Sequence, residues 1–522
     1  MGTQDIHCIM PPAPDVYNRI VASIRRAETG NKLPDRATGN LFDAATLTKI
    51  LTRPPKTRAH TLVSPTRQYA PVTGTRKALV LLVDFSDKAA TEPPDHFRDL
   101  LFSQGAYATG SMRDFYHEAS YGQLDVTGEV SGGTSSTTWY RAPNAKAYYT
   151  NGDYGFGTYP QNAQKLVEDV LDLAAPNVNF ADYDNDGDGT VEALVIIAAG
   201  SGGEATGDVN DIWSHKWAIT PRTLNGVTVS EYFMAPEDGR VGVMAHELGH
   251  LLMGWPDLYD TDYSSSGTGD WDLMAGGSWN NGGDTPAHPC AWCKTKVGWV
   301  TPTTITGAQG VTITPYASTP DVYMLPVGGT GGTQYFLLSD RHKTGFDSHL
   351  PGEGLIIEHV DENQANNTDE THYLVDIEQA DGKQDLNKNA NRGDATDPFP
   401  TASNSTFDGT STPNSDAYDG SDTQIAVINI QHAGDNVTAD VSLGAAPTAA
   451  AWHNNVTMTG TFTHHTTQWA WVYINGLGWR RIKDGSPDGV SNVFAACCLA
   501  VANGRPTNVF ADDQFLFTMY ML

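Results

Sequence analysis

Apolar positions are spaced unevenly along this chain of 522 residues, and several stretches predict regular structure. Residues 78–85 (ALVLLVDF) and 193–200 (ALVIIAAG) are almost continuously apolar, as are strands buried on both faces. Residues 161–174 carry apolar positions at helical spacing and predict an amphipathic helix, whereas residues 241–253 predict a buried one. These strands and helices together predict a mixed α/β domain in the first part of the chain.

From about residue 301 the pattern changes to short β-rich runs separated by Gly, Asn, Asp and Pro, which is typical of a β-sandwich. A small-residue linker, 444–451, precedes a last stretch in which strand candidates flank the helix-like run 492–503. Near the start, the helix-like run 16–28 is surrounded by polar, proline-bearing sequence. We therefore predict an α+β protein in four parts: an N-terminal arm or pro-segment (1–74), an α/β domain (75–300), a β-sandwich (301–445) and a small Trp-rich α+β module (452–522).

Composition and charge narrow the possible partners. The chain has 32 basic and 61 acidic residues, and this balance disfavours binding to nucleic acid or to an anionic membrane. No apolar run approaches the length of a membrane span, so we expect no membrane insertion. Residues 1–20 lack the charged start and apolar core of a signal peptide. The oligomeric state is left open.

Within the apolar helix, the segment HELGH places two histidines four residues apart. His246 and His250 lie one turn apart on the same helical face, where both can bind one metal ion. Neutral imidazoles suit Zn²⁺, and a catalytic zinc takes three protein ligands and one water. Glu247 is placed to accept the proton of that water. The pattern predicts a zinc hydrolase centre.

The third zinc ligand must come from beyond the helix. Gly254 offers a left-handed position that ends the helix, and Pro256 prevents the helix from resuming. The chain must turn there, so an oxygen ligand can return to the metal. Asp257 is the first candidate, and Asp260 is the second.

Seven segments of the chain resemble segments of the immune-inhibitor-A-like secreted metallopeptidases of bacteria and occur in the same order. These are metzincin-type enzymes. The family usually has a glycine three residues after the second histidine and an acid six residues after it. Here Met253 occupies the glycine position, and Gly254 and Asp257 each come one residue later. The resembling segments are 77–87, 110–130, 183–200, 211–217, 246–260, 271–279 and 335–362.

The resemblance implies a protein endopeptidase with a metzincin-like peptidase domain at 75–300, protein or peptide substrates, and export from the cell. It implies zinc binding by His246 and His250, general-base and then general-acid action by Glu247, and a methionine turn at Met274 below the metal. Some metzincins supply a tyrosine to the tetrahedral intermediate. Tyr259 could do so here, although packing is the simpler interpretation of this residue.

A second metal site is predicted in the segment DYDNDGDGTVE. Asp184, Asp186 and Asp188 alternate, and Glu192 follows, which is a spacing at which Ca²⁺ collects carboxylates. The backbone carbonyl of Thr190 would add an oxygen. No acid stands where an EF-hand requires its last ligand, so we predict a structural calcium loop of another kind. The alternative is an acidic turn that binds no ion.

The five cysteines support several interpretations. Cys290 and Cys293 form a CxxC pair, and we expect them, like the adjacent Cys497 and Cys498, to be buried thiols. Cys8 precedes the predicted peptidase domain. A cysteine in that position can cap a catalytic zinc as a latency switch, or it can have no role.

Two further features carry no predicted activity. The long polar loop 381–406 contains Asp394 and Asp397, for which a solvated loop is the simpler interpretation and calcium the alternative. In the C-terminal module, Trp469 and Trp471 would share one strand face. We expect the tryptophans of this module to form its core, with an exposed binding row as the alternative.

We therefore predict a zinc-dependent endopeptidase. The alternative is a catalytically impaired surface or matrix-binding protein that retains the peptidase scaffold, and the displaced Asp257 is the feature in its favour.

Overall fold

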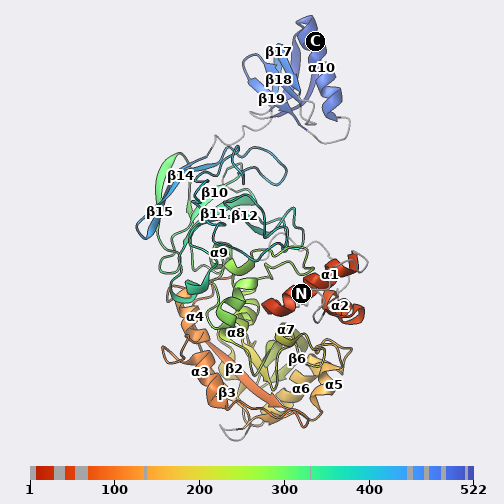
Figure 1. Ribbon diagram of the computed structural model, residues 1–522, viewed down its shortest axis with the longest axis vertical. Coiled ribbons are helices and arrows are strands. Elements are labelled where there is room, and N and C mark those ends of the chain that lie inside the picture. The colour runs from red at the N-terminus through yellow and green to blue at the C-terminus, as the bar shows by residue number, and fades with distance from the viewer. Residues whose placement is uncertain are drawn as a thin grey trace. The chain divides into compact units, whose positions relative to one another are not determined.

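The computed structural model describes residues 8–28, 41–52, 69–133, 138–329, 331–443, 451–463, 470–483, 489–511 and 515–522 (Figure 1). They form two compact units, Met1–Val327 with Thr333–Ser442, and Gly328–Gly332 with Leu443–Leu522. Both units mix helices with sheets, which confirms the α+β fold class. Within the described ranges, no helix has the length and apolar character needed to cross a membrane.

A seven-stranded sheet forms the centre of the first unit. Its two middle strands, β2 and β5, are the apolar runs predicted from the sequence, and every residue of β5 is buried. They pair in parallel, and β5 also pairs in parallel with β7, whereas β6 and β1 are antiparallel to their neighbours. The order is β1-β6-β7-β5-β2-β3, with β4 also pairing with β2. The strands are β1 (Cys8–Ile9), β2 (Gly74–Asp84), β3 (Leu124–Ser131), β4 (Tyr140–Arg141), β5 (Leu194–Ala198), β6 (His215–Leu224) and β7 (Val227–Pro236).

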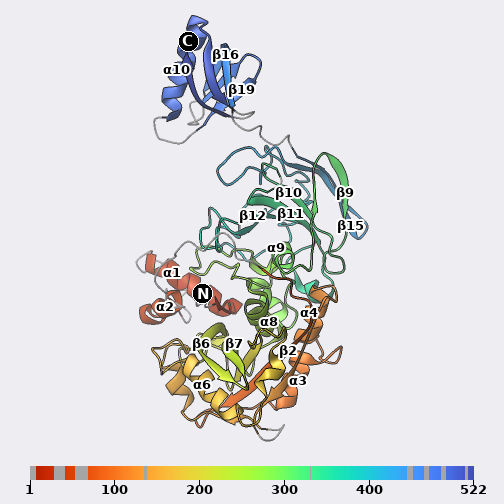
Figure 2. The ribbon, with the colours of Figure 1, turned by 180° about the vertical axis from the view of Figure 1, so that it is seen from behind.

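Helix α8 carries the first three residues of the HELGH segment, whose last two lie in the turn η3, and it lies between this sheet and α9 in both views (Figures 1 and 2). It packs against β7, β6, α3 and α4. Every residue of α8 is buried, which matches the apolar pattern from which it was predicted. The helices of this unit are α1 (Pro14–Glu28), α2 (Ala44–Leu51), α3 (Pro94–Phe102), α4 (Met112–Ala119), α5 (Lys146–Thr150), α6 (Ala163–Ala174), α7 (Gly203–Thr206), α8 (Val241–Leu248) and α9 (Ala291–Lys296). Single turns are η2 (Phe180–Tyr183), η3 (Gly249–Met253), η4 (Gly269–Trp271), η5 (Gly276–Gly283) and η6 (Gly345–His349).

The predicted β-rich region contains two sheets. One has the order β13-β12-β11-β10-β8, and the other has the order β14-β15-β9. Both belong to the same compact unit as the seven-stranded sheet. The domain boundaries at residues 74, 300 and 445 stay predictions. The strands are β8 (Thr303–Thr304), β9 (Gln309–Ile313), β10 (Tyr323–Pro326), β11 (Gln334–Arg341), β12 (Gly354–Asp361), β13 (Val375–Ile377), β14 (Ala426–Ala433) and β15 (Asn436–Ser442).

The second unit is a six-stranded sheet with one helix, in the order β16-β20-β21-β19-β18-β17. Its core consists of aliphatic residues, such as Val472 and Leu516, together with Cys497. The expectation that tryptophans form this core is wrong for Trp452 and Trp479, which are 49% and 47% exposed. Smaller side chains fill the space between sheet and helix, so these large rings lie outside it. The elements are β16 (Ala451–Val456), β17 (Met458–Thr463), β18 (Ala470–Ile474), β19 (Gly478–Ile482), α10 (Gly489–Asn503), β20 (Thr507–Ala511) and β21 (Phe515–Met521).

Some predictions fall outside the described residues. They concern Trp469, most of the linker 444–451, and parts of the N-terminal arm (1–7, 29–40 and 53–68).

Candidate metal centre

Helix α8 continues into η3, a π-helical turn that ends at Gly254 in the left-handed conformation, with φ of 71°. A π-helical turn holds one residue more than an α-helical turn does, and such turns are common at functional sites. Met253 is the last residue of this wider turn. The length of this turn therefore affects where the chain places Asp257.

The two histidines of the motif face each other. Nε2 of His246 lies 2.9 Å from Nε2 of His250, and both side chains are buried. The other ring nitrogens have carbonyl partners: Nδ1 of His246 lies 2.9 Å from the Leu273 carbonyl, and Nδ1 of His250 lies 2.7 Å from that of Trp255. A carbonyl only accepts hydrogen bonds, so each Nδ1 donates its proton and a neutral ring presents a lone pair at Nε2. Burial also lowers the pKa of His250, which favours the neutral ring.

Oδ1 of Asp257 lies next to the two Nε2 atoms, which gives three potential metal-ligand atoms in one place. Its Oδ1 lies 3.3 Å from Nε2 of His246 and 3.1 Å from Nε2 of His250. Two lone pairs and a carboxylate oxygen repel one another unless a cation lies between them. Tetrahedral zinc ligands about 2.1 Å from the ion lie about 3.4 Å apart, so the observed spacing fits such an ion.

Asp260, the alternative third ligand, points elsewhere. Its carboxylate accepts hydrogen bonds from the Ser264 hydroxyl at 2.7 Å and from the Ser265 backbone N–H at 2.9 Å. The structure thus brings Asp257, and not Asp260, to the histidine pair.

Glu247 is fully buried beside this group. Among the described residues, no hydrogen bond of ordinary geometry reaches either of its carboxylate oxygens, although the backbone N–H of Met10 lies near enough to act against a raised pKa. Burial raises the pKa of Glu247 well above its ordinary value, and the charge of Asp257 adds to this effect. A buried carboxyl without a partner is costly, so its retention next to a cation site points to a chemical role.

The start of the described chain lies against the same centre. Strand β1 pairs antiparallel with β6, with Cys8 opposite Lys216 and Ile9 opposite His215. The sulfur of Cys8 and ligand atoms of His250 and Asp257 all lie within 4.8 Å of one another.

Further hydrogen bonds hold this segment in place. Trp213 donates to the Met10 carbonyl at 2.7 Å, and Trp279 donates to the Pro11 carbonyl at 2.8 Å. The hydroxyl of Tyr259 donates to the Ile9 carbonyl at 3.0 Å. The hydroxyl of Tyr259 therefore finds a peptide carbonyl, and not solvent, as its partner beside the metal centre.

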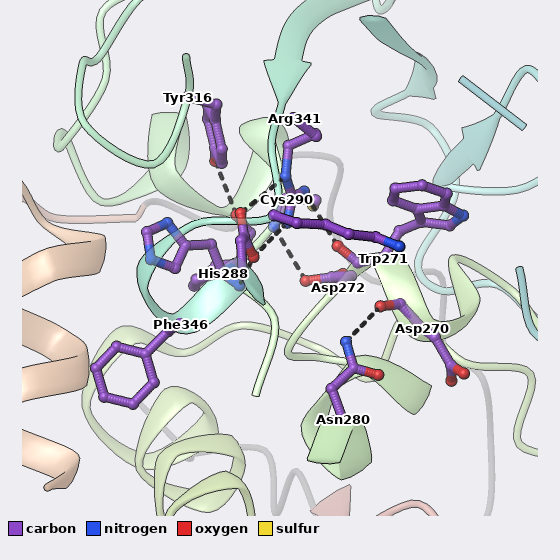
Figure 3. A network of polar contacts seen from close by, with 12 residues as sticks. Asp270, Trp271, Asp272, Asn280, His288, Cys290, Tyr316, Arg341 and Phe346 are labelled. Carbon is purple, nitrogen blue, oxygen red and sulfur yellow. Dashed lines mark hydrogen bonds and ion pairs between the residues drawn. The ribbon is translucent and has the colours of Figure 1, made fainter. Parts of the chain in front are cut away.

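Met274 lies directly below the helix. A Cβ added to Gly249 would lie 3.0 Å from the Met274 sulfur, so the glycine allows this close approach. The backbone on either side is fixed as well: the N–H of Met274 donates to Oδ1 of Asp272, and its carbonyl accepts from the Leu258 N–H. Figure 3 shows Asp272 in the polar network of this region.

The predicted calcium loop brings its acids together. Ligand oxygens of Asp184, Asp186, Asp188 and Glu192 all lie within 4.8 Å of one another. Thr190 lies between the last two in sequence, and its backbone forms an isolated bridge with Thr228. A second acidic group comprises Asp381, Asp385 and Asp394, whereas Asp397 is buried and accepts a hydrogen bond from Trp271.

Sequence reasoning missed two features of the site: the bond from Tyr259 to Ile9 and the burial of residues 8–12. The apolar run CIMPP was the available signal, because such a run in a polar arm indicates burial.

Residues 67–301 match the family described as immune inhibitor A peptidase M6, catalytic domain. The chain is 36% identical over 279 residues to the pre-pro-metalloprotease PrtV of Vibrio cholerae serotype O1, covering 42% of this chain and 29% of that protein. It is 32% identical over 312 residues to immune inhibitor A of Bacillus thuringiensis subsp. alesti, covering 49% and 43%. The match thus spans less than half the length of each relative.

Proposed function

Residues 67–301 belong to the immune inhibitor A peptidase M6 family, and from that premise we propose that this protein is a zinc-dependent endopeptidase acting on proteins. The observation that carries the proposal is the convergence of two imidazole Nε2 atoms and the Asp257 carboxylate within 3.3 Å of one another. His246, His250 and Asp257 would hold the zinc. When bound, this ion polarises the scissile carbonyl and lowers the pKa of a water molecule.

Glu247 is the residue that moves the proton. Its two unpartnered oxygens are free to accept a proton from the attacking water and to deliver it to the leaving amine nitrogen. The Tyr259 hydroxyl can donate to the carbonyl oxygen of a bound peptide, as it does to that of Ile9.

The N-terminal arm acts as a pro-segment in this proposal. An extended peptide binds an exposed sheet edge through backbone hydrogen bonds, and β1 occupies the edge beside β6 in this way. Cys8 lies close enough to His250 and Asp257 to supply the fourth ligand, which excludes the water needed for hydrolysis. The enzyme would therefore be latent until residues 8–12 leave the site.

The loop with Asp184, Asp186, Asp188, Thr190 and Glu192 would bind structural calcium. Its four carboxylates lie close together at the start of β5 and need a cation to offset their repulsion. The predicted substrates are proteins or peptides, and the family resemblance makes export the expected destination of the chain.

The alternative function, a binding protein with an inactive scaffold, drew its support from the one-residue displacement of Asp257. We infer that the π-helical turn η3 accommodates that displacement, which weakens the support for this alternative.

The test compares the full chain with its Glu247→Ala variant, before and after limited proteolysis of the arm. We expect zinc in both proteins and casein hydrolysis by the nicked parent alone, because Glu247 is not a ligand. Glu247→Gln serves as a control of similar size and should also be inactive. Hydrolysis by the nicked Glu247→Ala variant, or a parent that binds no zinc, would contradict the proposal.

A further inference from the structure

Cys290 and Cys293 stand at the start of α9. Cys290 is the residue that caps the helix, with extended φ and ψ of −60° and 167°, and Cys293 follows on the first turn. Side chains three residues apart on a helical turn lie next to each other. The two sulfur atoms and a carboxylate oxygen of Asp272 all lie within 4.8 Å of one another, and both cysteines are buried.

The backbone of Cys290 is linked by hydrogen bonds to the segment that orients His246. The Cys290 N–H donates to Oδ1 of Asp272 at 3.0 Å, and this oxygen also accepts from the Met274 N–H. Leu273 lies between Asp272 and Met274, and its carbonyl is the acceptor for Nδ1 of His246. Figure 3 shows Cys290 and Asp272 joined within this network.

The backbone of Cys293 is linked by a hydrogen bond to the residue that orients His250. The indole N–H of Trp255 donates to the Cys293 carbonyl at 2.8 Å. The backbone carbonyl of Trp255 is in turn the acceptor for Nδ1 of His250. The Leu273 carbonyl that orients His246 is thus linked to Cys290. The Trp255 carbonyl that orients His250 is linked to Cys293.

The surroundings favour a neutral form of sulfur. Burial raises the pKa of both thiols, that of Cys293 to about 12, and the buried Asp272 and Glu358 carboxyls disfavour thiolates further. Metal ligation and nucleophilic chemistry need thiolates. Asp272 already accepts hydrogen bonds from Met274, Cys290 and Thr268, so it is a poor candidate to complete a metal site. A disulfide places no charge in this environment.

We propose that Cys290 and Cys293 form a disulfide bond that closes the first turn of α9 and braces the carbonyls that orient His246 and His250. The oxidant is a small-molecule or protein disulfide. One cysteine thiolate attacks it and releases one thiol, and the second attacks the mixed disulfide and releases the other. Two protein thiols thus become one disulfide, and the oxidant is reduced to two thiols. Because both sulfurs are buried in the folded chain, the exchange takes place before α9 packs.

The test uses the full chain produced in an oxidising compartment and alkylated with iodoacetamide while it is denatured. Trypsin leaves both cysteines in the single peptide 241–294. We expect this peptide to be unalkylated and lighter than its reduced form by two hydrogen atoms. Cys498, which is partly exposed, serves as an internal reference for complete alkylation. Alkylation at both Cys290 and Cys293 would overturn the proposal.

A second measurement compares the parent with the Cys290→Ala/Cys293→Ala double variant, each refolded from the denatured state with and without a phosphine reductant. We expect the reductant to lower the Tm of the parent by about 2 °C and to leave that of the double variant unchanged. An equal shift in both proteins would contradict the bond. An extra zinc equivalent in the parent that the double variant lacks would show a metal site in its place. Both readouts are independent of peptidase activity.

Discussion

The hydroxyl of Tyr259 lies 3.0 Å from the Ile9 carbonyl, near the buried Glu247 and the partly buried Asp257. If this hydroxyl binds the substrate carbonyl in the same way, it contributes most once negative charge develops on the oxygen. We predict that Tyr259→Phe lowers kcat of the nicked enzyme by about 100-fold with little change in KM. Steady-state kinetics on a peptide substrate measure both constants.

The neighbouring Tyr263 provides the matched control for this prediction. Its ring centroid lies 6.5 Å from that of Tyr259, and Tyr263→Phe removes the same atom from the adjacent ring. This control should retain kcat. If Tyr259→Phe also retains kcat but weakens latency, the hydroxyl only holds the arm.

Latency can be tested at Cys8 alone. Its sulfur lies within 4.8 Å of ligand atoms of His250 and Asp257. We predict that Cys8→Ala raises the activity of the uncut chain by about tenfold or more, because each lost 1.4 kcal/mol of binding changes an equilibrium tenfold. Cys498→Ala, in the other compact unit, is the control. Equal activity of all three uncut proteins would argue against a thiol cap.

At the scale of elements, we infer that the π-helical turn η3 accommodates the one-residue displacement of Gly254 and Asp257 from the family pattern. Gly254 still takes the left-handed conformation, and Asp257 still reaches the histidine pair. We predict that deletion of Met253 converts this turn to an α-helical one and preserves zinc binding. Insertion of one alanine after Gly254 should abolish it, because no second wide turn is present there.

Zinc content measured by mass spectrometry, together with helix content from circular dichroism, tests this pair of variants. Loss of zinc in the deletion variant with an intact fold would mean that η3 has a role beyond absorbing one residue.

At the scale of the whole molecule, we predict that calcium in the acidic loop before β5 stabilises the first compact unit. Because an ion that binds only the folded state stabilises that state, we predict that chelation of calcium from zinc-saturated protein lowers Tm by about 3–8 °C. The Asp186→Asn/Asp188→Asn variant should no longer respond to calcium. Differential scanning calorimetry provides the measurement.

The second acidic group supplies the control for the calcium experiment. Asp381→Asn/Asp385→Asn removes a similar amount of charge from the group that also contains Asp394. We expect this variant to keep the full calcium response. A response lost there and kept at Asp186 and Asp188 would place the ion in the other loop.

The sequence by itself determined the elements whose pattern is local. Strands β2 and β5 follow from apolar runs, and α8 follows from an apolar stretch that ends at Gly254, because burial on every side requires apolar residues at every position. The spacing of His246 and His250 likewise follows from helical geometry alone.

Only the tertiary structure decided which distant groups meet. It brought Asp257, rather than Asp260, to the histidines, placed Cys8 and Ile9 beside them, and left Trp452 and Trp479 outside the core. These outcomes depend on a π-helical turn, on the pairing of β1 with β6 and on the packing of α10. Contacts between residues far apart in sequence are set by the whole fold, so no local pattern records them.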